Sequence, residues 1–457
     1  MIELDVQAKR TRSAAPAGDS PFRVLILGDF GAETPRPVLV DRDNIEAVID
    51  KLGVTLSLPL AGDIRFRGVA DFHPDQLYAR LPMFQELREA QRKLEDPNTF
   101  RQMAAEIAPP RPAAKPDVGA MLSSANLLDQ IVESSGAIGT GARAAADPFQ
   151  SYLQRLVAPY AVPRPDPKQK ELLTQVEAAV NGQMRSLLHD PAFQSLEAAW
   201  RGVDFLVHNV DSDVQIKVYV LNVPFESLRQ EMLMARDLKQ TRLYELLVRE
   251  PSVPGAARWS IVAGNYTFGA GPEDVELLGR ISLLASAGDA PFIAAANPDT
   301  ESWEKTPDYW KDLQAVPESC YVGLALPRML MRMPYGAKTE SVDTFDFEEL
   351  PAVPKHGDYL WGNAVFGCLR LLMDAFAEEG WAMEPSNELF IRDLPLHVYK
   401  QDGEAVSTPV AEVLMMQDDV ERLMDKGLMP LVSYKDQPLA RLAGFRALSG
   451  EMLGKRW

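Results

Sequence analysis

The sequence has few cysteines and no long apolar run, and each deficit excludes a class of protein. Two cysteines, Cys320 and Cys368, stand among 457 residues, which is too few for a disulfide framework and is typical of a reducing compartment. No apolar run reaches the roughly 20 residues that cross a bilayer. Basic residues near the N-terminus are not followed by the apolar stretch of a secretory signal. We therefore expect a cytoplasmic protein without membrane insertion, whose cysteines lie in the core.

Positive charge is scarce as well. The chain carries 47 lysines and arginines against 65 aspartates and glutamates, a formal net charge of -18 at pH 7. Phosphate backbones require a basic surface, so nucleic acid is excluded as a main partner. With 46% hydrophobic and 25% charged residues, the composition is typical of a globular protein, and the length allows about two to four domains.

The motifs of common enzyme classes are absent from the sequence. Neither the phosphate-binding loop Gly-x-x-x-x-Gly-Lys-Ser/Thr nor the nucleophile elbow Gly-x-Ser-x-Gly occurs. The histidines lack the spacing of metal ligands; they are His73, His189, His208, His356 and His397. Solvated turns and helix N-termini explain the pairs of acidic residues. The sequence therefore predicts no catalytic, cofactor-binding or metal-binding residues and a protein that is not an enzyme.

A short strand is predicted at the N-terminus. Ile2, Leu4 and Val6 alternate with acidic residues, which is the period of a half-buried strand. A polar leader separates this strand from the next element, so residues 1–21 form a segment of their own. Because it has no local partner, the strand is either frayed or donated to another chain by edge addition.

The remainder of the chain divides into two predicted domains. Residues 22–107 follow the pattern of strand, helix, hairpin and helices, which indicates a small α+β domain. Pro-rich sequence begins the segment 108–146, a linker that contains one short apolar helix. Residues 147–457 predict a larger, multi-layer α/β domain whose strands are buried on both faces.

The stretch 189–207, HDPAFQSLEAAWRGVDFLV, predicts a core helix. Asp190 and Pro191 make a favourable helix start. Apolar residues recur every three or four positions and give one buried stripe. Arg201 and Gly202 follow the tryptophan, so a cation stands near the helix end beside a residue that allows close packing.

This stretch resembles a signature of the large subunit of the type VI secretion contractile sheath, in the pattern HDPxFQxLExxWRG. Three further stretches resemble signatures of the same subunit, in the same order: CYVGLALPRMLMRMPYG at 320–336, FDFEEL at 345–350 and YLWGNAVFGCLRLLMDAFAEEGW at 359–381. The positions that carry the resemblance are Phe193, Leu196, Trp200, Arg201, Gly202, Pro327, Arg328, Pro334, Tyr335, Trp361, Gly362 and Asn363. The resemblance implies a phage-tail-sheath-like α/β fold.

The small domain resembles the small subunit of the same sheath. The matching pieces are LGDF at 27–30, RDNIEAVI at 42–49 and ADFHPDQL at 70–77. The two resemblances together imply a natural fusion of the small and large sheath subunits. The chain ends without the terminal portion that follows in the large subunit, so we expect a C-terminally truncated version of it.

The resemblance also implies a function. Sheath subunits assemble around an inner tube, and contraction of their lattice drives effector delivery. The implied partners are other sheath subunits (copies of this chain or full-length paralogues), the inner tube protein, the baseplate and an AAA+ disassembly ATPase. In the family that ATPase grips a short helix, and Leu127, Leu128 and Ile131 fall where this helix would be; packing on the domain's own core is the alternative.

Two other functional readings remain open. A chain that donates a strand but does not receive one would be a sheath-end cap or baseplate adaptor. The remote alternative is an α/β enzyme on a borrowed sheath fold.

Three charged residues, Arg328, Arg332 and Glu349, are candidates for ion pairs, either across a subunit interface or within the chain. His189 is expected to cap its helix or to pack at the helix start.

Overall fold

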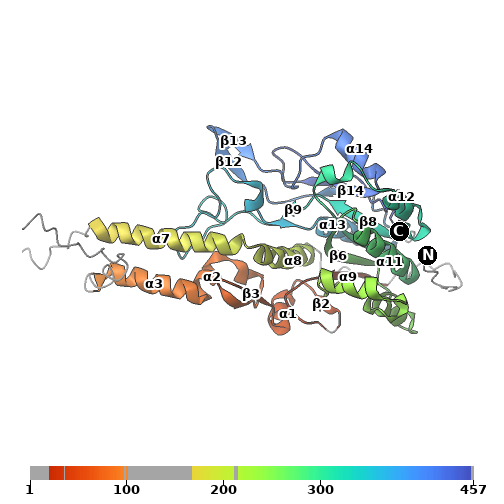
Figure 1. Cartoon of the computed structure of the whole chain (residues 1–457), viewed down its shortest axis with the longest axis horizontal. Helices are drawn as coiled ribbons and strands as arrows, with labels where there is room; N and C mark the ends of the chain where they lie inside the picture. Colours follow the sequence, from red (N-terminus) through yellow and green to blue (C-terminus); the bar gives the residue numbers. More distant parts are fainter. Residues whose placement is uncertain (1–19, 35, 97–98, 101–166, 210–214, 454–457) are drawn as a thin grey trace, which may run out of the picture. The chain divides into compact units, whose positions relative to one another are not determined.

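A nine-stranded sheet forms the centre of the fold (Figure 1). The structure is a computed structural model that describes residues 20–34, 36–96, 99–100, 167–209 and 215–453. From edge to edge the strands are β11 (Phe390–Ile391), β15 (Ala440–Leu442), β14 (Leu428–Ser433), β8 (Val322–Leu326), β7 (Phe292–Ala296), β6 (Ile261–Phe268), β1 (Phe22–Gly28), β5 (Ile216–Asn222) and β2 (Val38–Val40). The strands from β14 to β5 run parallel, and β2, β15 and β11 are antiparallel to their neighbours.

Strand β1 lies inside this sheet, with a partner on each side. It pairs with β5 from Phe22 to Gly28 and with β6 from Val24 to Leu27. Six of its seven residues are buried, which explains the continuous apolar run, because a strand covered on both faces has no solvent side. The first strand of the N-terminal part therefore completes a sheet whose other central strands come from beyond residue 215.

Helices cover both faces of the sheet. The main helices around it are α1 (Ile45–Leu52), α2 (Pro74–Arg80), α8 (Pro191–His208), α9 (Phe225–Met234), α11 (Pro272–Gly288), α12 (Asp308–Ala315), α13 (Val365–Glu379) and α14 (Gln417–Asp425). Helices α11 and α13 both pack against β7 and β8. Leu25 and Leu27 of β1 share a core cluster with α11, and none of the buried residues of α13 belongs to that cluster. The two helices therefore lie on opposite faces.

Small two-stranded sheets and helical turns complete the described part of the chain. The three two-stranded sheets are β3 (Thr55–Leu58) with β4 (Gly62–Arg65), β9 (Met329–Leu330) with β10 (Trp361–Gly362), and β12 (Val398–Gln401) with β13 (Glu404–Ser407). Cys320 and Cys368 are buried free thiols, as predicted. No helix within the described residues is long and apolar enough to cross a membrane.

The chain forms two compact units. One comprises residues 1–82 and 181–457, and the other comprises residues 83–180. The described part of the second unit contains α3 (Pro82–Glu95) and the beginning of α7 (Pro167–Leu188), which share a small core around Leu94 and Val176. The boundaries of the compact units, after residues 82 and 180, differ from the predicted domain boundaries. The predicted linker 108–146 lies outside the described residues. The division into domains 22–107 and 147–457 therefore stays a prediction.

Candidate functional site

The N-terminus of α8 is built as the sequence predicts. Pro191 occupies the first turn, and the Asp190 carboxylate accepts hydrogen bonds from the backbone N–H groups of Ala192 (2.9 Å) and Phe193 (3.2 Å). Such a cap satisfies N–H groups that the helix leaves without partners. Since Asp190 is the cap, His189 takes the other predicted role and packs, with its Nε2 3.6 Å from Oε1 of Glu349.

The apolar stripe of α8 is buried, as predicted. Phe193, Leu196 and Trp200 are each 5% exposed or less. The indole Nε1 of Trp200 donates a hydrogen bond of 3.1 Å to the carbonyl of Phe30, and the two rings meet edge to face with their centroids 5.3 Å apart. The signature tryptophan therefore ties α8 to the segment that follows β1.

Gly202 marks a close approach of two helices. A Cβ at this position would lie 2.3 Å from the nearest ring atom of Phe366 on α13. Since real Cβ atoms do not come that close, only glycine lets α8 and α13 pack at this distance. The prediction of close packing beside Trp200 is confirmed.

A buried cluster of charges lies on the polar side of α8. Nε of Arg201 and Nε of Arg332 donate to the same oxygen, Oε1 of Glu197, over 2.7 and 2.8 Å. The two terminal nitrogens of Arg332 donate to the two oxygens of Glu349 over 2.7 and 2.9 Å. Side chains of Glu197, Arg332 and Glu349 are at most 4% exposed. We call Glu197, Arg201, Arg332, Tyr335 and Glu349 the ionic cluster.

Tyr335 closes the ionic cluster. Its backbone N–H donates to Oε2 of Glu349 (2.8 Å), and its hydroxyl accepts from Nη2 of Arg201 (2.8 Å). The guanidinium of Arg332 lies over the tyrosine ring, 4.1 Å from the centroid. Three signature stretches, those around α8, around Arg332 and around Glu349, therefore meet at one buried point.

Electrostatics hold Glu349 and Arg332 of the ionic cluster in their charged forms. Burial by itself would raise the pKa of Glu349, but the neighbouring Arg332 with its hydrogen bonds, the nearby His189 and the N–H of Tyr335 lower it to about 2. Burial would likewise lower the pKa of Arg332, and the carboxylates of Glu197 and Glu349 raise it above the ordinary value. With two carboxylates and two guanidiniums the charges balance. Such a cluster anchors chain segments and does not shuttle protons near neutral pH.

The candidate ion pairs of the sequence are intramolecular. Arg332 pairs with Glu349 as described, and Arg328 pairs with Glu412, its Nε donating to Oε2 over 2.7 Å. His356 adds a contact of 2.8 Å between its Nε2 and Oε1 of Glu412. Each of these three charged side chains therefore has a partner within the chain, and a partner across a subunit interface is not needed to explain why a charged residue stands there.

The remaining signature residues serve the packing of the same region. Asn363 donates to the carbonyl of Tyr266 (3.1 Å) and accepts from the N–H of Val365 (2.9 Å) at the start of α13. Nε1 of Trp361 donates to the carbonyl of His356 (2.9 Å). Gly362 leaves room for Met331, whose sulfur would lie 2.3 Å from an added Cβ.

The two signature prolines lie at either end of the segment that carries Arg328 and Arg332. Pro327 follows a cis peptide bond, and the carbonyl of Pro334 accepts a 2.6 Å bond from the hydroxyl of Thr339. No signature residue within the described part of the chain stands as a free nucleophile or a convergent acid–base pair. The same part contains no group of three or more histidine, cysteine or acidic side chains that could hold a metal ion.

Sequence reasoning missed Glu197, the centre of the ionic cluster. It stands on a helix and is charged, which favours a solvent-facing position, yet it is fully buried. The available signal was its spacing of four residues from Arg201, the spacing at which side chains on a helix contact each other.

Two groups of predicted site residues lie outside the described residues: Ile2, Leu4 and Val6, and Leu127, Leu128 and Ile131.

Comparison with known proteins shows what the chain is similar to. The family model described as "VipB: EvpB/VC_A0108, tail sheath N-terminal domain" matches residues 170–449. The type VI secretion system sheath protein TssC1 of Pseudomonas aeruginosa is 30% identical over 305 residues, which is 61% of each chain. The chain thus spans less than two thirds of that relative. All four signature stretches lie within the region that the family model matches.

Proposed function

Because the chain belongs to the VipB family of tail-sheath proteins, we propose that it is a structural subunit of a type VI secretion contractile sheath. It assembles with other sheath subunits around an inner tube, and contraction of the lattice drives effector delivery. The observation that carries the proposal is the family match over residues 170–449, more than half of the chain. The name of the relative TssC1 supports the choice of secretion system.

The ionic cluster is consistent with this role. In a contractile lattice the subunits change their packing against one another while each keeps its own fold. Buried ion pairs have one favourable geometry, and removing one partner leaves an uncompensated charge. Segments that meet at the ionic cluster are therefore expected to move as one body. No step of the mechanism requires an active site in this chain.

The N-terminal part is proposed to be a fused small subunit. Support comes from β1, which lies between β5 and β6, and from Asp75, whose Oδ1 accepts a 2.9 Å hydrogen bond from the N–H of Thr344. Tyr78 also meets Phe345, with ring centroids 4.5 Å apart. A covalent linker raises the effective concentration of the two parts to the millimolar range or above.

Cleavage of the linker tests the fusion. A protease site introduced within residues 108–118 allows the purified chain to be cut there. We expect both fragments to elute together from a size-exclusion column without denaturant, because β1 remains hydrogen-bonded on both sides. Fragments that separate at micromolar concentration would contradict the proposal of two self-associating subunits. The uncut variant is the control for effects of the inserted site.

Further partners follow from the sheath role and are proposals as well. They are the inner tube protein, the baseplate and an AAA+ ATPase that dismantles contracted sheaths, and the assembly is proposed to lie in the cytoplasm. For the ATPase the proposed contact is the helix that contains Leu127, Leu128 and Ile131. Replacing all three with alanine should abolish disassembly by the ATPase without preventing assembly.

Negative-stain electron microscopy tests the function directly. The purified chain is imaged alone and after mixing with full-length sheath proteins of the same bacterium. Tubes with helical order, formed alone or by co-assembly along the tube wall, are expected. Binding confined to tube ends would identify the chain as a cap or baseplate adaptor. A chain that neither polymerises nor joins a tube would overturn the sheath proposal.

A further inference from the structure

A loop leaves the ionic cluster and returns to it. Residues 336–348 stand between Tyr335 and Glu349, which are joined twice. The N–H of Glu349 donates to the carbonyl of Tyr335 (2.9 Å), and the N–H of Tyr335 donates to Oε2 of Glu349 (2.8 Å). We call residues 336–348 the cluster loop. Both of its ends are therefore fixed at the same buried charges.

The distal half of the cluster loop has no regular structure of its own. Its first half closes a turn, in which the N–H of Gly336 donates to the carbonyl of Glu340 (2.8 Å). Residues 341–348 belong to no helix or strand, and among the described residues none of them makes a backbone–backbone hydrogen bond. Arg185 holds one end by donating to the carbonyl of Glu348 (2.9 Å). A segment of this kind is ordered only by contacts from other elements.

Asp75 of α2 supplies the main polar contact to this half. Its Oδ1 accepts hydrogen bonds from the N–H (2.9 Å) and the hydroxyl (2.5 Å) of Thr344, and its Oδ2 accepts from the N–H of Asp343 (3.2 Å). Burial would raise the pKa of Asp75, but the Thr344 hydroxyl, the two N–H groups and the nearby His73 lower it. A carboxylate therefore binds two consecutive backbone N–H groups and one hydroxyl.

The start of α2 leaves the carboxylate of Asp75 available for this contact. Nδ1 of His73 caps the helix by accepting from the N–H of Asp75 (3.2 Å), so the cap does not use the Asp75 side chain. The ring of His73 meets Tyr335 edge to face, with the centroids 4.8 Å apart. Tyr78 meets Phe345 with the centroids 4.5 Å apart. One helix thus contacts the cluster loop at its stem and in its distal half.

The hydrogen-bond donors of the cluster loop distinguish a carboxylate from an amide. Hydrogen bonds to a carboxylate are stronger than those to a neutral acceptor. An asparagine at position 75 accepts from Thr344 through its single carbonyl oxygen, but its amide then meets the N–H of Asp343 donor to donor. The two side chains have the same size, so the difference lies in the hydrogen bonds alone.

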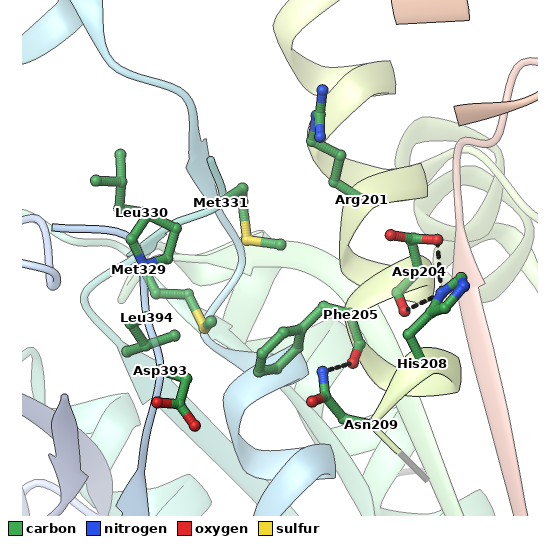
Figure 2. Close-up of a pocket in the computed structure, with 11 residues that line it drawn as sticks. Arg201, Asp204, Phe205, His208, Asn209, Met329, Leu330, Met331, Asp393 and Leu394 are labelled. Atoms are coloured by element: carbon green, nitrogen blue, oxygen red, sulfur yellow. Dashed lines mark hydrogen bonds and ion pairs between the residues drawn. The ribbon is translucent and has the colours of Figure 1, made fainter. Parts of the chain in front are cut away.

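The ionic cluster also borders a pocket of about 250 Å³ beside the end of α8, which Arg201 lines (Figure 2). Figure 2 shows the guanidinium of Arg201 directed away from Asp204 and His208, which pair with each other over 2.9 Å between Oδ1 and Nδ1. Asp393 lines the pocket too. Its lining carries carboxylates and basic side chains together and favours neither an anion nor a cation. The cluster loop, in contrast, presents donors that match one acidic side chain.

We propose that the cluster loop is the element by which the C-terminal part recognises the small-subunit-like part, that it folds onto α2, and that Asp75 is the residue it selects. The inference rests on the proposed fused small subunit and names the residues by which the two parts identify each other. The recognised chemistry is a helix that carries a carboxylate and, three residues later, an aromatic ring on the same face, as Asp75 and Tyr78 do.

Hydrogen exchange of the uncut chain tests this recognition. Peptides that cover residues 336–348 are followed by mass spectrometry in the native chain and in Asp75→Asn. Exchange in the cluster loop should become about tenfold faster or more, because two backbone N–H groups lose a charged acceptor. Asp346→Asn is the matched control, since Asp346 is exposed on the same loop, and it should leave the exchange unchanged. Peptides from α13 serve as the internal reference.

The affinity of the two parts gives a second readout. After cleavage at the site introduced within residues 108–118, the dissociation constant of the fragments is measured by dilution. Asp75→Asn should raise it about tenfold or more, and Thr344→Val should raise it less, because only the hydroxyl is lost. The two effects should not add in the double variant, since these side chains bond each other. Asp43→Asn, at an exposed position of the N-terminal part, should leave the constant unchanged.

The outcomes separate this recognition from the fusion itself. Faster exchange confined to the cluster loop, with weaker association of the fragments, supports the recognition. Unchanged exchange in the loop, with native fragments that stay together, overturns it and leaves the fused small subunit standing. Faster exchange in α13 as well would show that Asp75 acts on the whole fold, and it would overturn the assignment. Native fragments that separate count against the fusion, whereas exchange in the uncut chain still decides on the cluster loop.

Discussion

Replacing Glu349 with glutamine removes one charge from the ionic cluster. The substitution Glu349→Gln keeps the size of the side chain and leaves Arg332 with Glu197 as its remaining carboxylate. The two terminal nitrogens of Arg332, which donate to Glu349 in the native chain, lose their ionic partner. Because Arg332 is charged and buried, water does not replace that partner. We expect the folded state to lose stability without a change of fold.

The magnitude follows from the pKa of Glu349. Its value of about 2 in the folded chain, against an ordinary 4.5, corresponds to about 3 kcal/mol of stability at neutral pH. The usual cost of removing one partner from a buried ion pair, about 3–5 kcal/mol, agrees with this value. Since domains are stable by about 5–15 kcal/mol in total, the effect is large enough to measure by urea unfolding.

The loss should depend on pH with a definite sign. The pKa is lowered by folding, so the stabilisation from Glu349 is complete above about pH 4.5 and disappears as the pH falls towards 2. The difference between the native chain and Glu349→Gln should therefore shrink from about 3 kcal/mol at pH 7 to about 1.4 kcal/mol at pH 3. Carboxylates that do not contact the ionic cluster keep the same surroundings in both proteins, so their contributions cancel in the difference.

Urea unfolding followed by circular dichroism at pH 7 and pH 3 measures this difference. Glu304→Gln is the matched control, because Glu304 is exposed, and it should change stability by no more than about 0.5 kcal/mol. A difference for Glu349→Gln below about 1 kcal/mol at pH 7, or one that is equal at both pH values, would show that the ionic cluster does not contribute as described.

Two further substitutions probe the packing of α8. Gly202→Ala should cost about 1–3 kcal/mol, because its Cβ overlaps the ring of Phe366; Gly182→Ala, in the helix α7 with nothing within 4 Å of the added Cβ, should stabilise by about 0.5–1 kcal/mol. Trp200→Phe should cost about 1–3 kcal/mol in the same unfolding assay, because the buried carbonyl of Phe30 loses its donor. Equal stabilities of the two alanine variants, or a Trp200→Phe variant as stable as the native chain, would contradict the packing described.

Local elements were largely predictable from the sequence. Continuous apolar residues predicted β1. Apolar spacings of three and four after an Asp-Pro start predicted α8. Both predictions were possible because burial and helix capping depend on the pattern of residues within one stretch of chain. Family signatures extended this to the fold class and to membership in the sheath family. The roles of Arg201 and Glu197 were not predictable in the same way, since a charged residue on a helix is usually at the surface.

The sequence alone thus determined which segments are strands and helices, which faces of them are apolar, and which family the chain resembles. Only the tertiary structure decided that β1 lies between β5 and β6, and that Glu197, Arg332 and Glu349 share one buried site. The physical reason is that the periodicity of apolar residues predicts which side chains are buried, but it does not predict which distant side chains they contact. For apolar residues many neighbours suffice, whereas a buried charge needs one particular partner at hydrogen-bond distance.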